Sequence, residues 1–222
     1  MDQKQNELYF LWLVVQENQE FRKRNKTVVE ETLKALLRTL EIKDRYTHGH
    51  SQRVAFFARL IAENMGFEEE EIQEIKLAAM LHDLGKIGTP LEILNKPGKL
   101  TDEEFDVIKE HPIYSYEIIS QVSSLQNIAR WIRAHQERMD GFGYPDGLKG
   151  EEIPLQARII TVADAFDAMT SDRPYRKALS LETAYEELKR CAGTQFDKEV
   201  VKVFLDVYQN HLAEKQVRKK RA

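Results

Sequence analysis

Apolar residues recur at helical spacing in segment after segment of this chain, and this periodicity limits the fold more than any other feature of the sequence. Val54, Phe57, Ala58 and Ile61 follow offsets of three, four and seven, which place side chains on one face of an α-helix. Two segments after residue 180 follow the same rule. We find neither the alternation typical of a strand nor an internal repeat. The sequence therefore predicts an all-α fold.

Length and charge set the broad class of protein. The 222 residues, 25.9 kDa in mass, are enough for one substantial domain with its own core. The net charge of -4 argues against a nucleic-acid polymer as partner, so a polyanionic ligand would need a local basic cluster or a metal. The single cysteine, Cys191, cannot form an internal disulfide and is expected to fill a helix face. We expect a cytoplasmic protein.

The N-terminal region differs from the rest. Leu8–Val15 is apolar but far too short to span a bilayer, and no signal peptide is evident, so we expect no membrane insertion. We predict an N-terminal helix or linker over residues 1–42, which could mediate dimerisation, a helical domain over 43–212, and a basic tail over 213–222. An N-terminal helix of this kind often joins a partner module, so an N-terminal sensor domain or a homodimer is a possible arrangement.

The stretch from Leu81 to Ile87 places an imidazole, a carboxylate and an ammonium within five positions, at the end of a helix predicted over 68–84. His82 and Asp83 offer a neutral nitrogen and an anionic oxygen, a combination suited to Mn, Fe, Co or Zn. Adjacent residues do not share a helical face, which suggests a carboxylate that bridges two ions. For the pair alone, a helix end at Gly85 followed by Lys86 is the simpler interpretation.

Further candidate ligands lie far away in the sequence. His50 precedes Val54 by four positions and points toward the predicted core, and Asp164 lies among apolar neighbours, where an unpaired carboxylate would be costly.

Residues 140–150 hold four of the ten glycines and form the longest irregular stretch, typical of a lid or binding loop as well as of a surface turn. The capping box of Thr101 and Glu104 opens a helix predicted to stop before His111-Pro112.

Collected in order, the candidate metal ligands are His50, His82, Asp83, His111, His135 and Asp164. This order resembles the HD superfamily of metal-dependent phosphohydrolases. The loop Asp140-Gly141-Phe142-Gly143-Tyr144-Pro145, followed by Arg173-Pro174-Tyr175-Arg176, is similar to the HD-GYP family in particular. The similarity covers residues 44–177, so the predicted domain over 43–212 is interpreted as an HD-GYP catalytic domain.

This resemblance implies a helical HD-domain bundle and a phosphodiesterase that hydrolyses cyclic di-GMP, a bacterial signalling molecule, to linear pGpG and sometimes to GMP. It implies two divalent ions, Mn or Fe, the first held by His50, His82, Asp83 and Asp164. Asp83 would bridge to a second ion held also by His111 and His135. A hydroxide shared by two metals would serve as nucleophile. Lys86 could stabilise charge on the phosphate, Arg173 and Arg176 could clamp it, and Tyr144 could stack on guanine or contact phosphate, with Gly143 shaping the loop.

Three positions depart from the family pattern. Gln136 stands where HD-GYP proteins usually have a second consecutive histidine, and an amide oxygen is a poor substitute for imidazole. Tyr46 replaces a glutamate that holds a third metal in some members, and Ser115 replaces a glycine. The alternatives are therefore a weak or inactive cyclic-dinucleotide receptor, favoured by Gln136, and an HD phosphohydrolase acting on mononucleotides, against which the Gly-Tyr-Pro loop argues.

Overall fold

The computed structural model describes residues 49–172 and 177–221, together with Lys43 and separate positions between 16 and 39. The side chains of Asn210 and of residues 212–221 are excepted. Tyr46, Arg173 and Arg176 lie outside the described residues, as do most of residues 1–42. The chain divides into two compact units, Met1–Thr39 and Leu40–Ala222. Every described residue of the first unit is helical.

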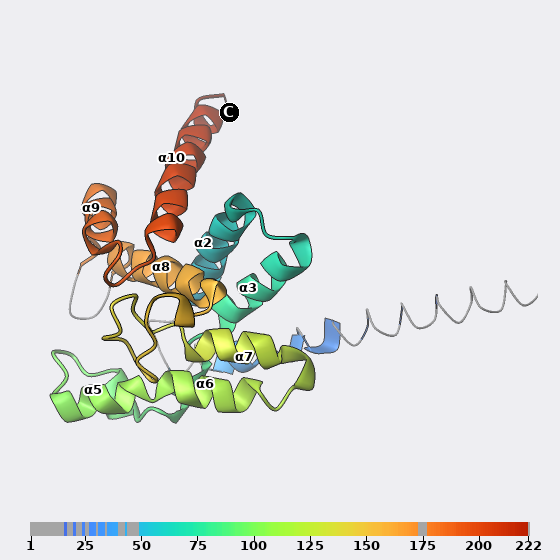
Figure 1. The fold of residues 1–222 in the computed structure, drawn as a ribbon, viewed down its shortest axis with the longest axis vertical. Coiled ribbons are helices and arrows are strands. Elements are labelled where there is room, and N and C mark those ends of the chain that lie inside the picture. The colour runs from blue at the N-terminus through green and yellow to red at the C-terminus, as the bar shows by residue number, and fades with distance from the viewer. Residues whose placement is uncertain are drawn as a thin grey trace, which may run out of the picture. The chain divides into compact units, whose positions relative to one another are not determined.

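The second unit is built from helices joined by turns and by one longer segment between α7 and η3, and its described residues form no strand (Figure 1). The predicted all-α fold is confirmed. The helices, in chain order, are α2 (His50–Met65), α3 (Glu69–Leu81), η1 (Leu84–Gly88), α4 (Leu91–Leu94), α5 (Asp102–Lys109), α6 (His111–Ile119), η2 (Ser123–Leu125), α7 (Gln126–Arg133), η3 (Gly150–Glu152), α8 (Leu155–Thr170), α9 (Leu181–Cys191) and α10 (Lys198–Arg221).

The core forms where α2 packs against α3, α8 and α10. Phe57 of α2, Phe166 of α8 and Phe204 of α10 meet edge to face, with ring centroids 4.7 to 5.8 Å apart. A second layer consists of α6 packed on η1 and α7. Figure 1 shows α8 between this layer and the pair α9 and α10. None of the helices within the described residues has the length and apolar content needed to cross a membrane.

Local sequence signals explain several helix ends. Gly66 ends α2 in the left-handed conformation, with φ at 82°, where glycine avoids a steric cost. Thr101 accepts a hydrogen bond from the Glu104 amide, and the Glu104 side chain accepts one from the Thr101 amide, so the predicted capping box is present.

Of two predicted helix ends, one differs from the structure and one is confirmed. The helix expected to continue to Leu84 ends at Leu81, and a 3-10 helix begins at Leu84. The helix opened by Thr101 ends at Lys109, so the predicted stop before His111-Pro112 is confirmed, and after Glu110 a new helix, α6, begins at His111. Proline is tolerated there because the amides of the first helical turn have no partner within the helix.

Candidate metal centre

Six side chains from distant parts of the second unit converge on one buried cluster. His50 begins α2, His111 begins α6, and His82 and Asp83 follow the last residue of α3. The remaining two are His135, two residues beyond α7, and Asp164, in the middle of α8. Each histidine is at most 6% exposed, so these polar groups need partners inside the protein.

The Asp83 carboxylate lies between two groups of ligand atoms. Its Oδ2 is 3.5 Å from His82 Nε2 and 3.7 Å from His50 Nε2, whereas its Oδ1 is 3.4 Å from His111 Nε2. Asp164 Oδ1 is 3.3 Å from His50 Nε2 and 3.9 Å from His82 Nε2. The two oxygens of Asp83 therefore face different histidines, an arrangement that would allow this carboxylate to bridge two ions.

The other nitrogen of three histidines is fixed by the backbone. His82, His111 and His135 each place Nδ1 2.6 to 2.7 Å from the carbonyl oxygen three residues earlier. A carbonyl can only accept, so Nδ1 carries the proton and donates, and Nε2 presents its lone pair. His82 Nε2 is buried without a hydrogen-bond partner. His111 Nε2 and His135 Nε2 lie 3.3 Å apart.

His50 is oriented by a second carboxylate that the sequence analysis did not identify. Its Nδ1 lies 2.7 Å from Asp167 Oδ2, and Arg53 binds the same carboxylate through Nε at 2.5 Å and Nη2 at 3.0 Å. His50 and Arg53 are one turn apart on α2, and Asp164 and Asp167 are one turn apart on α8. This matched spacing of three residues on α2 and α8 was the sequence signal that could have identified Asp167. It allows the two α2 side chains to contact the two α8 carboxylates where the helices pack together.

Electrostatics favour an anionic Asp83 beside neutral imidazoles at His111 and His135, and a protonated imidazole at His50. Burial acts to raise the pKa of Asp83, but Lys86 and the neighbouring histidines hold it well below its usual range. Burial lowers the pKa of His111 to about 4 and that of His135 to about 3. Burial also acts to lower the pKa of His50, but hydrogen bonds to Asp164 and Asp167 outweigh it and raise the value to about 9.

This donor set fits divalent transition metals. Two groups of buried or half-buried ligands, His50 with His82 and Asp164, and His82 with Asp83 and His135, each bring their ligand atoms within 4.8 Å of one another. Imidazole and carboxylate donors suit Mn, Fe, Co and Zn. With the proton on Nδ1 of both rings, the unprotonated Nε2 atoms of His111 and His135 lie 3.3 Å apart. Two lone pairs at this distance repel each other unless a cation lies between or beside them.

Lys86 lies beside the cluster, and the backbone around it is bound by Lys43. Its Nζ is 2.6 Å from Asp83 Oδ2. Lys43 places its own ammonium against the carbonyl oxygens of Lys86, Ile87 and Thr89, at the carboxyl end of η1. A cation is favourable at that end of a helix. Lys86 thus contacts a candidate metal ligand, and its predicted role toward substrate stays a prediction.

Ser115 and Gln136, two of the family departures, have defined places. Ser115 Oγ accepts from the Gly85 amide at 2.7 Å and donates to the His82 carbonyl at 3.0 Å, which fixes the turn after His82. Gly85 is required at this turn because a Cβ would lie 2.0 Å from the His111 carbonyl oxygen. Gln136 donates to Asp164 Oδ2 at 3.4 Å, so its amide lies at the edge of the cluster.

The loop over residues 139–149 packs onto the segment that carries His135. Glu137 Oε1 accepts from the Asp146 amide at 2.7 Å and the Gly147 amide at 3.1 Å. Gly143 lies so close to the backbone that a Cβ would be 2.4 Å from Glu137 Cα. Tyr144 is consequently held with its ring centroid 6.4 Å from that of His111. Burial raises the pKa of both Tyr144 and Glu137.

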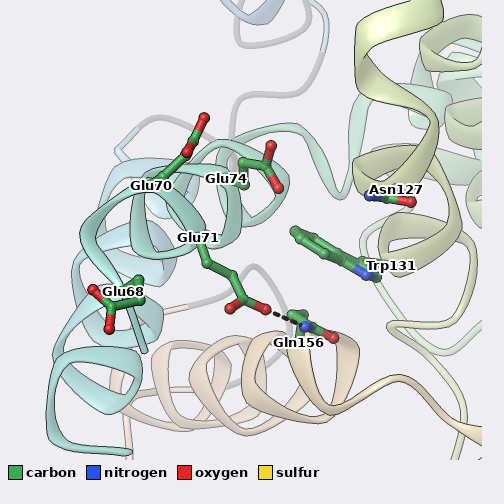
Figure 2. Close-up of a pocket in the computed structure, with 7 residues that line it drawn as sticks. All are labelled: Glu68, Glu70, Glu71, Glu74, Asn127, Trp131 and Gln156. Carbon is green, nitrogen blue, oxygen red and sulfur yellow. Dashed lines mark hydrogen bonds between the residues drawn. The ribbon is translucent and has the colours of Figure 1, made fainter. Parts of the chain in front are cut away.

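A separate hollow of about 550 Å³ opens between α3, α7 and α8. Figure 2 shows Glu71 and Trp131 facing it, with Gln156 bonded to Glu71 at 2.6 Å. Four glutamates line it, together with Asn127, Trp131 and Gln156. It contains none of the six clustered ligands, and among the described residues its glutamates do not form a close metal-binding group.

The fold and the cluster together define a class of protein, a helical domain with a buried histidine–carboxylate centre suited to divalent ions. A family model described as "HD domain" matches residues 34–200. The chain therefore belongs to the HD domain family. Its resemblance to the HD-GYP group within that family is confirmed by relatives and by the fold.

Three curated relatives show the extent of the similarity. A cyclic di-GMP phosphodiesterase of Thermotoga maritima is 44% identical over 88% of this chain and 54% of its own length. The cyclic di-GMP phosphodiesterase response regulator RpfG of Xanthomonas campestris is 46% identical over 79% of this chain and 47% of its own. A 3'3'-cGAMP-specific phosphodiesterase of Vibrio cholerae is 41% identical over 72% and 35%. The chain thus spans about a third to a half of these relatives.

A solved structure agrees on the fold. Bd1817, an HD-GYP-type protein of Bdellovibrio bacteriovorus, aligns with a TM-score of 0.60 at 22% identity, over 72% of this chain and 51% of that one. The HD-domain helical bundle is thereby confirmed.

Proposed function

We propose that this chain is a metal-dependent phosphodiesterase that opens cyclic di-GMP to linear pGpG. The relatives named above support the substrate class, since two are named for cyclic di-GMP and one for 3'3'-cGAMP. The observation that carries the proposal is the position of Asp83, whose two carboxylate oxygens face His82 and His50 on one side and His111 on the other.

We assign His50, His82, Asp83 and Asp164 to one ion, and Asp83, His111 and His135 to a second. Two divalent ions, Mn or Fe, would supply a water acidified enough to act as nucleophile at neutral pH and would offset negative charge on the phosphodiester. In the net reaction water adds to phosphorus, the bond from phosphorus to the 3' oxygen breaks, and that oxygen leaves as a hydroxyl. The linear product keeps a 5' phosphate.

The protein's own groups position this chemistry. The carbonyls that hold Nδ1 of His82, His111 and His135 aim each Nε2 inward, and Asp167 aims His50. Lys86, 2.6 Å from Asp83, adds positive charge where a phosphate would approach. Tyr144 closes the side of the cluster next to His111. Arg173 and Arg176 stay candidate phosphate ligands by sequence.

The test is a product assay. The chain, loaded with Mn or anaerobically with Fe, is incubated with cyclic di-GMP, and the nucleotides are separated by chromatography. We expect pGpG to accumulate at a rate proportional to metal content. The absence of any linear product under both metal conditions would overturn the proposed activity.

A second candidate function is a cyclic-dinucleotide receptor with little or no turnover. Gln136 favours it, because its amide contacts Asp164 and adds no imidazole to the centre. Gln136→His separates the two functions. A weakened enzyme should gain metal and rate on this substitution, whereas a receptor should bind cyclic di-GMP tightly and stay inactive with histidine at position 136.

A further inference from the structure

A row of aromatic rings leads outward from the proposed metal centre. The His135 and His111 ring centroids are 5.2 Å apart, and Tyr144 follows His111 at 6.4 Å. Phe105 of α5 follows Tyr144 at another 6.4 Å. Exposure increases along the row, from 2% at His111 to 43% at Phe105. The row thus begins beside Asp83 and ends in solvent.

Phe105 does not serve the hydrophobic core. No residue of α5 is fully buried; Val107 and Ile108 are half-buried, whereas Phe105 is exposed. This helix is nevertheless firmly placed. Its capping box closes on Glu104, and Lys96 Nζ binds both oxygens of the Glu104 carboxylate at 2.8 and 2.6 Å. A single exposed apolar residue is common on protein surfaces, but Phe105 lies at the outer end of the ring row that starts in the proposed metal centre.

The geometry of Phe105 and Tyr144 suits a planar base. Their rings meet at 83°, so they form two walls of a corner. A purine can place its face on one wall and its edge against the other, the two arrangements that aromatic rings prefer. Lys109 Nζ lies 4.9 Å from the Phe105 ring centroid and 2.7 Å from Asp106 Oδ1, so its charge beside this corner is paired. The ligand class that matches is a purine joined to a phosphodiester.

We propose that Phe105 and Tyr144 form a base-binding subsite for one purine of the cyclic dinucleotide, while the adjoining phosphodiester occupies the metal centre. This inference rests on the proposed function and deepens it. A stacking platform contacts the π-face that every base shares and does not discriminate by hydrogen bonds. The subsite should therefore contribute similarly to the binding of cyclic di-GMP and 3'3'-cGAMP.

The test is steady-state kinetics on the metal-loaded full chain with Phe105→Ala. Base–aromatic stacking energies correspond to a rise in KM of about 5- to 150-fold, which we expect for both cyclic dinucleotides, with kcat nearly unchanged. Methyl p-nitrophenyl phosphate, a phosphodiester without a base, should be hydrolysed at the wild-type rate. Phe105→Trp should restore KM, whereas Phe105→Leu, which keeps apolar bulk and loses the ring, should not.

The matched control is Phe56→Ala. Phe56 is 42% exposed, close to the value for Phe105, but its ring contacts Phe57 and His211 away from the clustered ligands. It should leave KM unchanged. An unchanged KM for Phe105→Ala, or an equal loss on the base-free diester, would overturn the subsite.

Failure of the proposed function gives a different pattern, in which the wild-type chain cleaves the base-free diester but neither cyclic dinucleotide. Calorimetric binding of cyclic di-GMP to the wild-type and Phe105→Ala chains then decides the subsite. Equal affinities, or no binding at all, would contradict it, and weaker binding by the variant would support it.

Discussion

Asp83 joins the two halves of the proposed centre at the scale of a single residue. Its side chain is nearly inaccessible, Lys86 balances its charge at 2.6 Å, and Nε2 atoms of three histidines lie 3.4 to 3.7 Å from its oxygens. An isolated buried carboxylate would be strongly destabilising, so the arrangement makes sense where cations complete it. The same residue should control both metal content and reaction.

Asp83→Ala is therefore expected to remove most of the bound metal and abolish hydrolysis of cyclic di-GMP. Elemental analysis of the purified protein measures the metal, and circular dichroism checks that the variant is folded. Asp206→Ala, which removes an exposed carboxylate on α10, is the control and should retain both. Unchanged metal content in Asp83→Ala would show that our ligand assignment is wrong.

At the scale of elements, the segment after α7 has two structural roles. It supplies His135, and through Glu137 it anchors the loop that carries Tyr144. Because His135 and Glu137 are two positions apart, movement of the loop should also move His135. Helices α8 and α10 are connected by a different device, in which Arg158 of α8 binds Asp197, the residue before α10, at 2.8 Å.

Glu137→Ala is expected to release the loop. Hydrogen bonds to charged acceptors contribute about 1.5 to 3 kcal/mol, so amide exchange at Asp146 and Gly147 should accelerate at least about tenfold. Hydrogen exchange followed by mass spectrometry or NMR measures this. Glu137→Gln keeps an acceptor oxygen and should retain most of the protection. Equal exchange in the alanine and glutamine variants would contradict the anchoring role.

Asp197→Asn tests the connection between α8 and α10 through its pH dependence. Asparagine still caps α10, so the substitution removes mainly the charge that Arg158 binds. At pH 7 we expect a loss of about 2 kcal/mol in the free energy of unfolding, since the pair is largely buried.

Burial acts to raise the pKa of Asp197, but the hydrogen bond from Arg158 and the α10 amides lower it below its ordinary value. A lowered folded-state pKa gives stability that is present above the unfolded-state value, about 3.9, and is lost as the pH falls through the folded-state value. Urea unfolding should thus show a constant difference in the free energy of unfolding between wild type and Asp197→Asn from pH 7 to 5. This difference should become smaller below pH 4, as Asp197 becomes protonated. A difference that becomes larger there would show that it does not come from the charge of Asp197.

At the scale of the whole unit, the six ligands come from α2, the turn after α3, α6, the turn after α7 and α8. Metal bound to them would cross-link most of the bundle. A ligand that binds the folded state alone stabilises it by about 2.7 kcal/mol at a concentration 100 times its Kd.

Chelation is therefore expected to lower the Tm by roughly 5 to 10 °C, given 2 to 4 °C per kcal/mol for a domain of this size. Differential scanning calorimetry with and without EDTA measures the change. Asp83→Ala should respond far less to the chelator. A wild-type Tm that does not respond to chelation would argue against a structural contribution from the metals.

The sequence by itself determined the all-α class and the identity of the candidate ligands, because apolar spacing, helix caps and ligand chemistry are local properties. Gly66 and the Thr101–Glu104 box mark helix ends through their own backbone and side-chain preferences. The order of histidines and aspartates was enough to indicate the HD family before any distance was known.

Tertiary packing alone decided which atoms meet. Asp167 binds His50 and Arg53 across 117 and 114 residues of sequence, and no local rule requires these helices to touch. Likewise, the place of Phe105 beside Tyr144 and of Ser115 beneath His82 depends on how α5, α6 and the loop pack. Hydrogen bonds and ring contacts act over a few ångströms, and only the folded chain brings these residues within that range.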